Sequence, residues 1–502
     1  MMTHLVVLPI IIPLVTAGLA VLTRKSGTLQ RWLGVMGMIA QIIISVLLLW
    51  QVMDHGILAT QMGNWAAPFG ITLVADLLSA IMVVITAIMG FAVAVYSLAD
   101  IDKTRESYGY YPLLHLLLMG VNGTFLTGDI FNMYVWFEVM LISSFVLLAL
   151  GNEKTQMEGA IKYVIINIIS SSFLLIGIAL LYGMFGTLNM ADLANKIAGS
   201  DSPGLVTAIS MLFMVSFSIK AAMFPLFFWL PASYHTPPVA VSAIFAGLLT
   251  KVGVYTLLRF FTLIFIQDVA YTHHILLWAA GLTMLTGVLG AASQNEVRKI
   301  LSFHIVSQIG YMVMGLALFT PLAIVGSVFY IVHHIIVKTN LFLVAGVASR
   351  LTGSFELSKM GGLWRHYPWL GALFLIPAFS LAGFPPLSGF WAKLTLIYAG
   401  LEIESYPIVI VALVVGLLTL FSMTKIWAAA FWSPMADDKI DISDFRKVIT
   451  KWDLTLLVIP MVILAALTVT IGLYAQPFYE VSLEAAEQLL NPSIYINAVL
   501  GQ

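Results

Sequence analysis

The sequence has 502 residues, of which 61% are hydrophobic and only 9% charged, and its net charge is −1. Soluble domains carry about 25% charged residues, so this composition excludes a soluble globular protein and predicts a polytopic membrane protein. The small net charge and the lack of a basic block argue against nucleic-acid binding. The absence of cysteine excludes thiolate-held iron–sulfur clusters, cysteine zinc sites and disulfides.

Apolar runs of about 20 residues are long enough to cross a bilayer as helices, and the chain contains fourteen of them. The linkers are too short to hold a soluble domain, so we expect the function to lie inside the membrane. The first run lacks the features of a signal peptide and is interpreted as a span. The predicted spans are 4–22, 32–52, 72–98, 111–127, 130–150, 159–184, 204–229, 239–262, 272–292, 298–318, 322–349, 369–400, 406–432 and 453–476.

The basic residues are distributed unevenly between the two sets of loops. Positively charged short loops stay in the cytoplasm, and the even-numbered loops and both tails hold only Lys196 and Arg259. We therefore predict that the odd-numbered loops are cytoplasmic and that both termini lie outside. The basic residues at odd-numbered loops are Arg24, Lys25, Arg31, Lys103, Arg105, Lys154, Lys162, Arg298, Lys299, Arg350, Lys359, Arg365, Lys439, Arg446, Lys447 and Lys451.

Five lysines and one glutamate lie inside the apolar runs. Insertion scales assign about 2.5–3.5 kcal/mol to a centrally placed charge, so four or five lysines plus the glutamate cost on the order of 12–20 kcal/mol before compensation. Snorkelling, favoured most at Lys425, and static salt bridges are the structural alternatives. One glutamate cannot neutralise several mid-helix lysines, which favours an aqueous path with proton exchange. The set is Glu138, Lys220, Lys251, Lys338, Lys393 and Lys425.

Histidines add titratable groups, because their ordinary pKa is near 6.5. Tyr330, His334 and Lys338 follow one another at intervals of four residues, so they share one helix face. His304 is a further candidate. A lone membrane histidine is commonly a hydrogen-bonded helix contact, and this interpretation is favoured for His115.

Two of the predicted helices are interrupted by proline. Pro225 follows Lys220, and Pro385–Pro386 precede Lys393. Proline breaks a helix, and paired broken helices in the two halves of a membrane protein point to a transport site. We expect these prolines to act as hinges beside the two lysines.

The lysines of the two breaks are 173 residues apart, and Lys251 and Lys425 are 174 apart. This common offset predicts an internal duplication. The same offset carries Glu138 to Tyr311, so the glutamate is not duplicated. Each copy holds five spans, so the copies would form an inverted repeat. The predicted units are residues 1–107 (helices 1–3), 108–268 (first repeat), 269–432 (second repeat) and 433–502 (helix 14 and an external tail with a short polar helix).

Four segments resemble the antiporter-like membrane subunits shared by Mrp cation/proton antiporters and respiratory complex I. The match is closest to D-type Mrp subunits, and complex I members of one type differ in having glutamate where Lys393 stands. The matching segments are 128–138 (GDIFNMYVWFE), 224–231 (FPLFFWLP) with 235–239 (HTPPV), 300–304 (ILSFH) and 329–338 (FYIVHHIIVK).

The resemblance implies a fourteen-helix fold and a half-membrane proton path. Glu138 would pair with Lys220, and Lys251 would continue the path toward the centre. The residues that would carry protons onward to the opposite side are His334, Lys338 and Lys393.

The leading function is proton translocation coupled to exchange of Na⁺ within a hetero-oligomeric antiporter of a prokaryotic cell membrane, with no cofactor or metal site of its own. The main alternative is a proton-pumping subunit of an NADH–quinone or hydrogenase-type complex. A quinone- or haem-binding subunit and a scaffold without an ion path are further alternatives. His333 points about 100° away from His334, which makes haem ligation by both poor. No Walker, Rossmann or GxSxG motif supports an enzyme.

Overall fold

The computed structural model describes residues 2–434 and 449–501. The predicted all-α membrane architecture is confirmed, because the described residues include eleven helices that are long and apolar enough to cross a membrane. These are α2 (Gly27–His55), α3 (Leu77–Asp100), α6 (Ile130–Ala149), α7 (Lys154–Phe185), α9 (Pro203–Ala221), α11 to α12 (Val239–Leu263), α13 (Val269–Ser293), α14 (Val297–Leu318), α15 (Pro321–Thr352), α19 to η5 (Tyr406–Trp432) and α20 (Lys451–Leu473).

Shorter helices occupy the remaining predicted spans, so each of the fourteen runs coincides with a helix or a broken pair of helices. The number of membrane crossings and the inverted repeat stay predictions. The shorter apolar elements are α1 (Leu8–Leu22), α5 (Tyr110–Leu126), α17 (Pro368–Ala382) and α18 (Ser388–Glu402). Short connecting helices are α4 (Lys103–Ser107), α8 (Met190–Ala198), α10 (Trp229–Ser233) and α16 (Leu363–His366).

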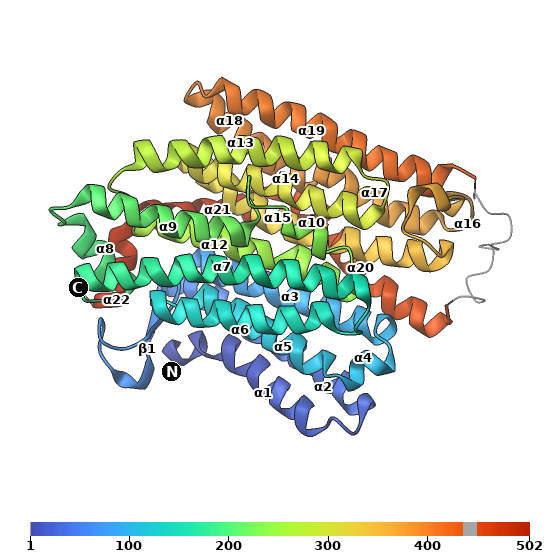
Figure 1. Ribbon diagram of the computed structural model, residues 1–502, viewed down its shortest axis with the longest axis horizontal. Helices are drawn as coiled ribbons and strands as arrows, with labels where there is room; N and C mark the ends of the chain where they lie inside the picture. Colours follow the sequence, from blue (N-terminus) through green and yellow to red (C-terminus); the bar gives the residue numbers. More distant parts are fainter. Residues whose placement is uncertain (1, 435–448, 502) are drawn as a thin grey trace.

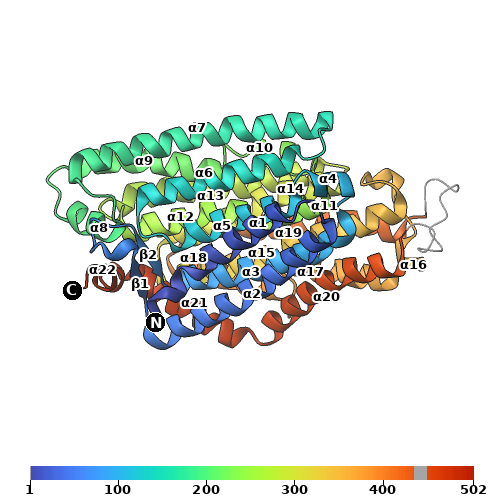
Figure 2. The same ribbon diagram turned by 90° about the horizontal axis from the view of Figure 1, so that it is seen from below.

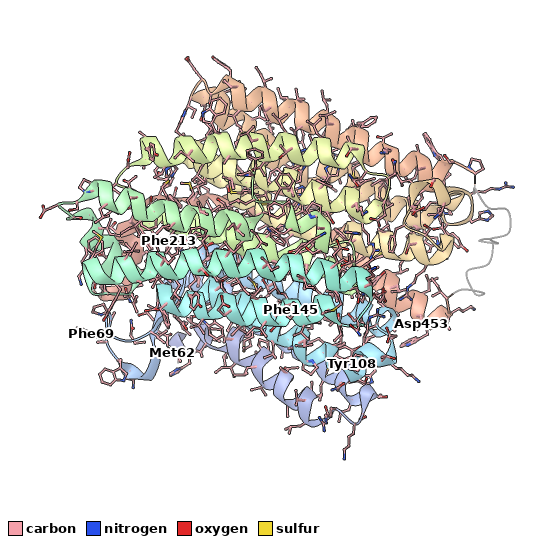
Figure 3. All side chains as sticks on the ribbon, in the orientation of Figure 1. Met62, Phe69, Tyr108, Phe145, Phe213 and Asp453 are labelled. Atoms are coloured by element: carbon pink, nitrogen blue, oxygen red, sulfur yellow. The ribbon has the colours of Figure 1, made fainter. Side chains whose placement is uncertain are left out.

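The long helices run along the long axis of the molecule, and the two chain ends lie at the same end of it (Figure 1). Helices α12, α14 and α15 form the centre, since 89–100% of their apolar windows is buried. Helices α7 and α9 lie on one side of this centre and α20 on the opposite side (Figure 2). Figure 3 places Phe69, near the β-hairpin, and Asp453, in α20, at opposite ends of the molecule.

A β-hairpin was not expected from the sequence. Strands β1 (Leu58–Gln61) and β2 (Thr72–Ala75) pair antiparallel, and β2 occupies the start of the predicted span 72–98. All four residues of β2 are buried, so it lacks the apolar–polar alternation that identifies a strand. The following helix begins at Leu77, where Asp76 and Ser79 form a capping box.

The C-terminal segment is a packed part of the molecule. After α20 the chain forms α21 (Ala475–Leu490) and α22 (Pro492–Leu500), and α21 packs against α3 and α15. The Gln488 side-chain oxygen accepts a hydrogen bond of 2.9 Å from the Leu77 amide. The sequence predicted a short polar helix followed by a tail in this segment. The structure has two successive helices, and Tyr495 and Val499 of the second are buried.

The loop assignment of Arg259 was wrong. This residue lies within α12, is 5% exposed and forms a buried ion pair with Asp76. Its guanidinium also lies 5.1 Å from the Tyr495 ring centroid, so pairing and ring contacts compensate for burial. Of the basic residues used for orientation, Lys439, Arg446 and Lys447 lie outside the described residues.

Candidate functional site

The first helix break presents Lys220 in the last turn of α9. Helix α9 ends at Ala221, and Ala222 follows in the left-handed conformation with φ 60°. The backbone groups freed by the break are satisfied by side chains: the Trp229 indole donates to the Ile219 carbonyl at 3.1 Å, and the Phe224 amide donates to Thr283 at 2.9 Å. The interruption of the helix is therefore stabilised by the surrounding structure.

Lys220 lies close to Glu138 but is not paired with it. The Lys220 ammonium donates to the Ser171 hydroxyl at 3.3 Å and lies 4.5 Å from the Phe137 ring centroid. Glu138 lies within electrostatic reach of Lys220, and one of its carboxylate oxygens is buried with no hydrogen-bond partner in the part of the chain that the structure describes. The structure thus brings the predicted pair into one neighbourhood and leaves it open.

Lys251 is fully buried one helix further in. The turn η3 (Phe245–Leu249) is π-helical, and such a turn disturbs the usual α-helical hydrogen bonding. The Lys251 ammonium donates to the Ala246 carbonyl of this turn at 2.5 Å. Gly253 allows α12 to approach α9 closely, because a β-carbon there would lie 2.8 Å from the Lys220 carbonyl carbon.

Three fully buried groups form the centre of the site. His304, His334 and Lys338 each have 0% exposure, and neither the ring nitrogens of the histidines nor the Lys338 ammonium has a hydrogen-bond partner among the described residues. Lys338 lies within electrostatic reach of Lys251 and of both histidines. Buried polar groups without protein partners are commonly hydrogen-bonded to water molecules. This centre is therefore suited to a chain of bound water molecules.

The second break carries Lys393 in α18. Helix α17 ends at Ala382, followed by Gly383 with φ 92° and a cis bond between the two prolines. The Lys393 ammonium donates to the Ala382 carbonyl at 3.1 Å. It therefore lies at the carbonyl end of a half-helix, where the helix dipole favours a cation.

A pair of stacked tyrosines lies next to Lys393. The Lys393 ammonium is 4.9 Å from the Tyr311 ring centroid, and Tyr311 stacks on Tyr330 at 5.2 Å with an interplanar angle of 8°. The Tyr330 hydroxyl donates to the Gln308 side-chain oxygen. The predicted residues on the second half of the path are thus brought together.

Sequence reasoning missed one histidine of this region. The Nδ1 atom of His333 is 2.8 Å from the Ser388 hydroxyl, which lies 3.1 Å from that of Ser380. His333 therefore links α15 to both halves of the second broken helix. The sequence signal for His333 was its position next to His334. The different directions of the two side chains were weighed only against haem binding, not as a contact of His333 with another helix.

Lys425 stands apart from these groups. Its ammonium donates to the backbone carbonyls of Ala292 at 3.1 Å and Gln294 at 2.6 Å. These contacts satisfy carbonyls at the C-terminal end of α13, where a cation is favourable. The structure brings together Glu138, Lys220, Lys251, His304, Tyr330, His334, Lys338 and Lys393, while Lys425 lies at a helix end.

Two broken helices with a row of buried cations between them define an antiporter-like, ion-translocating membrane subunit. The model of the NADH:quinone oxidoreductase/Mrp antiporter transmembrane family matches residues 127–419. The chain belongs to this family, which confirms the resemblance seen in the sequence motifs.

Similar proteins are known at full length. The D-type component of the Na⁺/H⁺ antiporter of Alkalihalophilus pseudofirmus is 48% identical over 501 residues, covering 100% of both chains. A chain of the Mrp complex from Dietzia sp. shares 34% identity with a TM-score of 0.89, covering 100% of this chain and 99% of that one. A chain of the membrane-bound sulfane sulfur reductase, an archaeal respiratory complex, shares 26% identity with a TM-score of 0.91, covering 99% and 100%.

Proposed function

We propose that this protein is a proton-translocating, D-type subunit of a multisubunit Na⁺/H⁺ antiporter. The observation that carries the proposal is the row of buried cations without acidic partners: among the described residues, none of Lys220, Lys251, Lys338 and Lys393 forms an ion pair. Static salt bridges therefore do not account for them. Burying four lysines at this depth costs about 10–14 kcal/mol. A scaffold without an ion path would gain nothing from this cost.

The open Glu138–Lys220 pair supplies the switch. Closing the pair favours the charged ammonium, and opening it favours release of the proton to water. The released proton moves to Lys251, crosses the centre through His334, Lys338 and His304, and reaches Lys393. Each transfer needs groups within hydrogen-bond reach or bridged by one water, and the partnerless central groups leave sites for such waters.

The proposed topology places both termini outside a prokaryotic cell membrane. The chain ends lie together in Figure 1, and the described basic loops lie at the other end of the molecule. Positive-inside bias would put that other end in the cytoplasm. We also propose that residues 108–268 and 269–432 are the two inverted units, because each contains a helix that ends in a left-handed residue before proline.

The relatives support assembly with other antiporter subunits, and the transported ions would be H⁺ and Na⁺. Such exchange serves pH homeostasis and sodium tolerance. This assignment makes the protein a transporter subunit rather than an enzyme. The second candidate is a proton-pumping subunit of a respiratory complex, favoured by the similarity to the sulfane sulfur reductase chain.

The test uses the complete complex purified from its native gene cluster and reconstituted into liposomes. A Na⁺ gradient should drive proton movement, measured with a pH-sensitive dye, in a preparation without flavin or iron–sulfur absorption. Proton movement that requires an electron donor, together with flavin in the preparation, would replace the antiporter assignment with the respiratory one.

A further inference from the structure

A narrow apolar slot lies on the side of the molecule that carries α20 (Figure 2). It has a volume of about 200 Å³ and is bounded by α2, α3, α15, α20 and α21. Among the described residues that line it, Ser482 has the one polar side chain, and its hydroxyl donates to the Phe478 carbonyl at 2.7 Å. The slot therefore offers a ligand contacts with hydrocarbon.

The dimensions of the slot match those of one hydrocarbon chain. Its lining runs from Ile81 to Ile88 on α3 and from Phe329 to Ile336 on α15, and each stretch is about 10 Å long. The volume over this length gives a mean cross-section of about 20 Å². Apolar heavy atoms pack about 4.0–4.5 Å apart, so one extended chain occupies about 16–20 Å² in section. A helix with its side chains is about 10–12 Å wide, so a helix of another subunit is too wide to enter.

The slot adjoins a wider and more polar cavity, which we call the mouth. The mouth has a volume of about 770 Å³ and shares Phe329 with the slot. It lies where α20 ends and α21 begins. Tryptophan and tyrosine are enriched at the level of lipid head groups, so an apolar slot with this mouth matches the two parts of a lipid. The side chains that bring polar atoms to the mouth are Trp391, Thr395, Tyr398, Gln476 and Tyr479.

The charges around the mouth favour a head group without net charge. Among the described residues that line it, none is charged. Glu480 follows Tyr479 in α21, and its carboxylate accepts a hydrogen bond of 2.8 Å from the Gln476 amide. A carboxylate at this position attracts an ammonium group and repels an anionic head group. The mouth thus fits a zwitterionic phospholipid with an amine head group.

The slot lies behind the helix that carries the central histidine and lysine. Val332 and Ile336 line it from α15, and both lie about 160° around this helix from His334. Side chains beside an empty space lose dispersion contacts on that side. A chain bound in the slot therefore packs against the back of α15 and holds it in place.

We propose that the slot and its mouth form a binding site for one zwitterionic phospholipid, with an acyl chain between α3, α15, α20 and α21. The inference does not depend on proton translocation. The slot lies within the apolar span of α3, where the bilayer itself supplies hydrocarbon chains. The site therefore fills directly from the membrane.

The test is photo-crosslinking of the assembled complex. Complexes are reconstituted into vesicles of phosphatidylethanolamine and phosphatidylglycerol that contain phosphatidylethanolamine with a diazirine in one acyl chain. They are extracted and washed with detergent before illumination, and adducts are located by mass spectrometry of peptides. Specific sites differ from bulk contacts mainly in slower release, so adducts in residues 81–88 and 329–336 should exceed those on α19 about tenfold.

Val332→Trp is the sharpest variant, because the indole fills the slot from its wall. It should abolish the retained adducts on α3. The matched control is Val414→Trp, since this valine is 43% exposed on α19 and its replacement should leave the slot adducts unchanged. Should Val332→Trp not assemble, Ile88→Trp fills the slot from α3 and is judged by the adducts on α15.

Equal loss of adducts from the slot and from α19 during washing would overturn the proposal. Labelling of α19 without labelling of the slot, in vesicles illuminated before extraction, would also overturn it, because protein would then cover the slot. A phosphatidylglycerol probe retained as strongly as the phosphatidylethanolamine probe would overturn the assignment of the head group.

Discussion

Replacing Lys338 with methionine should stabilise the protein and at the same time stop proton transfer. Methionine is similar in length and apolar, so it fills the same space without a charge. The Lys338 ammonium is fully buried and has no hydrogen-bond partner among the described residues. Removing it should therefore recover up to the full cost of a central charge, about 2.5–3.5 kcal/mol.

Lys251→Met is the matched comparison on the neighbouring helix. Its ammonium is equally buried but donates to the Ala246 carbonyl at 2.5 Å. A hydrogen bond to a charged group contributes about 1.5–3 kcal/mol, which offsets most of the recovered cost. The expected gain in unfolding free energy is therefore only about 1 kcal/mol.

The assay is thermal unfolding of the purified complex followed by tryptophan fluorescence, together with exchange in vesicles. The midpoints should rise in the order wild type, Lys251→Met, Lys338→Met, and both variants should lose exchange. A lower midpoint for Lys338→Met than for wild type would refute the reasoning, because it would show that the lysine stabilises the fold.

Three further predictions concern packing and helix ends. Gly253→Ala should lower the free energy of unfolding by about 1–3 kcal/mol and slow exchange. Gly183 has open space around it, so Gly183→Ala should leave stability and exchange unchanged in the same unfolding and vesicle assays. Arg259→Ala should cost about 3–5 kcal/mol by leaving Asp76 buried and unpaired, and adding Asp76→Asn should restore part of the unfolding midpoint. Lys425→Ala should lower the midpoint by removing a helix-end contact, with exchange per assembled complex kept; abolished exchange would place Lys425 in the path.

Sequence reasoning found the spans and the buried lysines because both depend on strong local signals. A run of about 20 apolar residues is unambiguous, and a lysine inside such a run stands out at once. The two breaks were equally visible, since Pro225 and Pro385 interrupt apolar helices.

Features that depend on contacts between distant segments were not predictable. The pairing of Arg259 with Asp76 joins α12 to the start of α3, and nothing near either residue indicates it. The role of His333 depends on Ser388 in another helix. The π-helical turn before Lys251 has no sequence signature that periodicity detects, yet it supplies the carbonyl that this lysine binds.

The openness of the Glu138–Lys220 pair is likewise a property of the packed structure. The family resemblance implied that the two residues pair, and the structure places Ser171 and the Phe137 ring next to the ammonium instead of the carboxylate. In the proposed mechanism, this arrangement lets the pair act as a switch rather than as a fixed salt bridge.

The central claim is that protons pass through Lys220 under the control of Glu138. The most direct measurement is Na⁺-driven proton exchange in everted vesicles from antiporter-deficient cells expressing the whole gene cluster, with Lys220→Ala and Glu138→Ala in assembled complexes. Lys162→Ala is the control, because this lysine is exposed and, among the described residues, forms its ion pair with Glu158 on its own helix. The account predicts that both relay variants lose exchange while the control keeps it; near-normal exchange in both relay variants would contradict it.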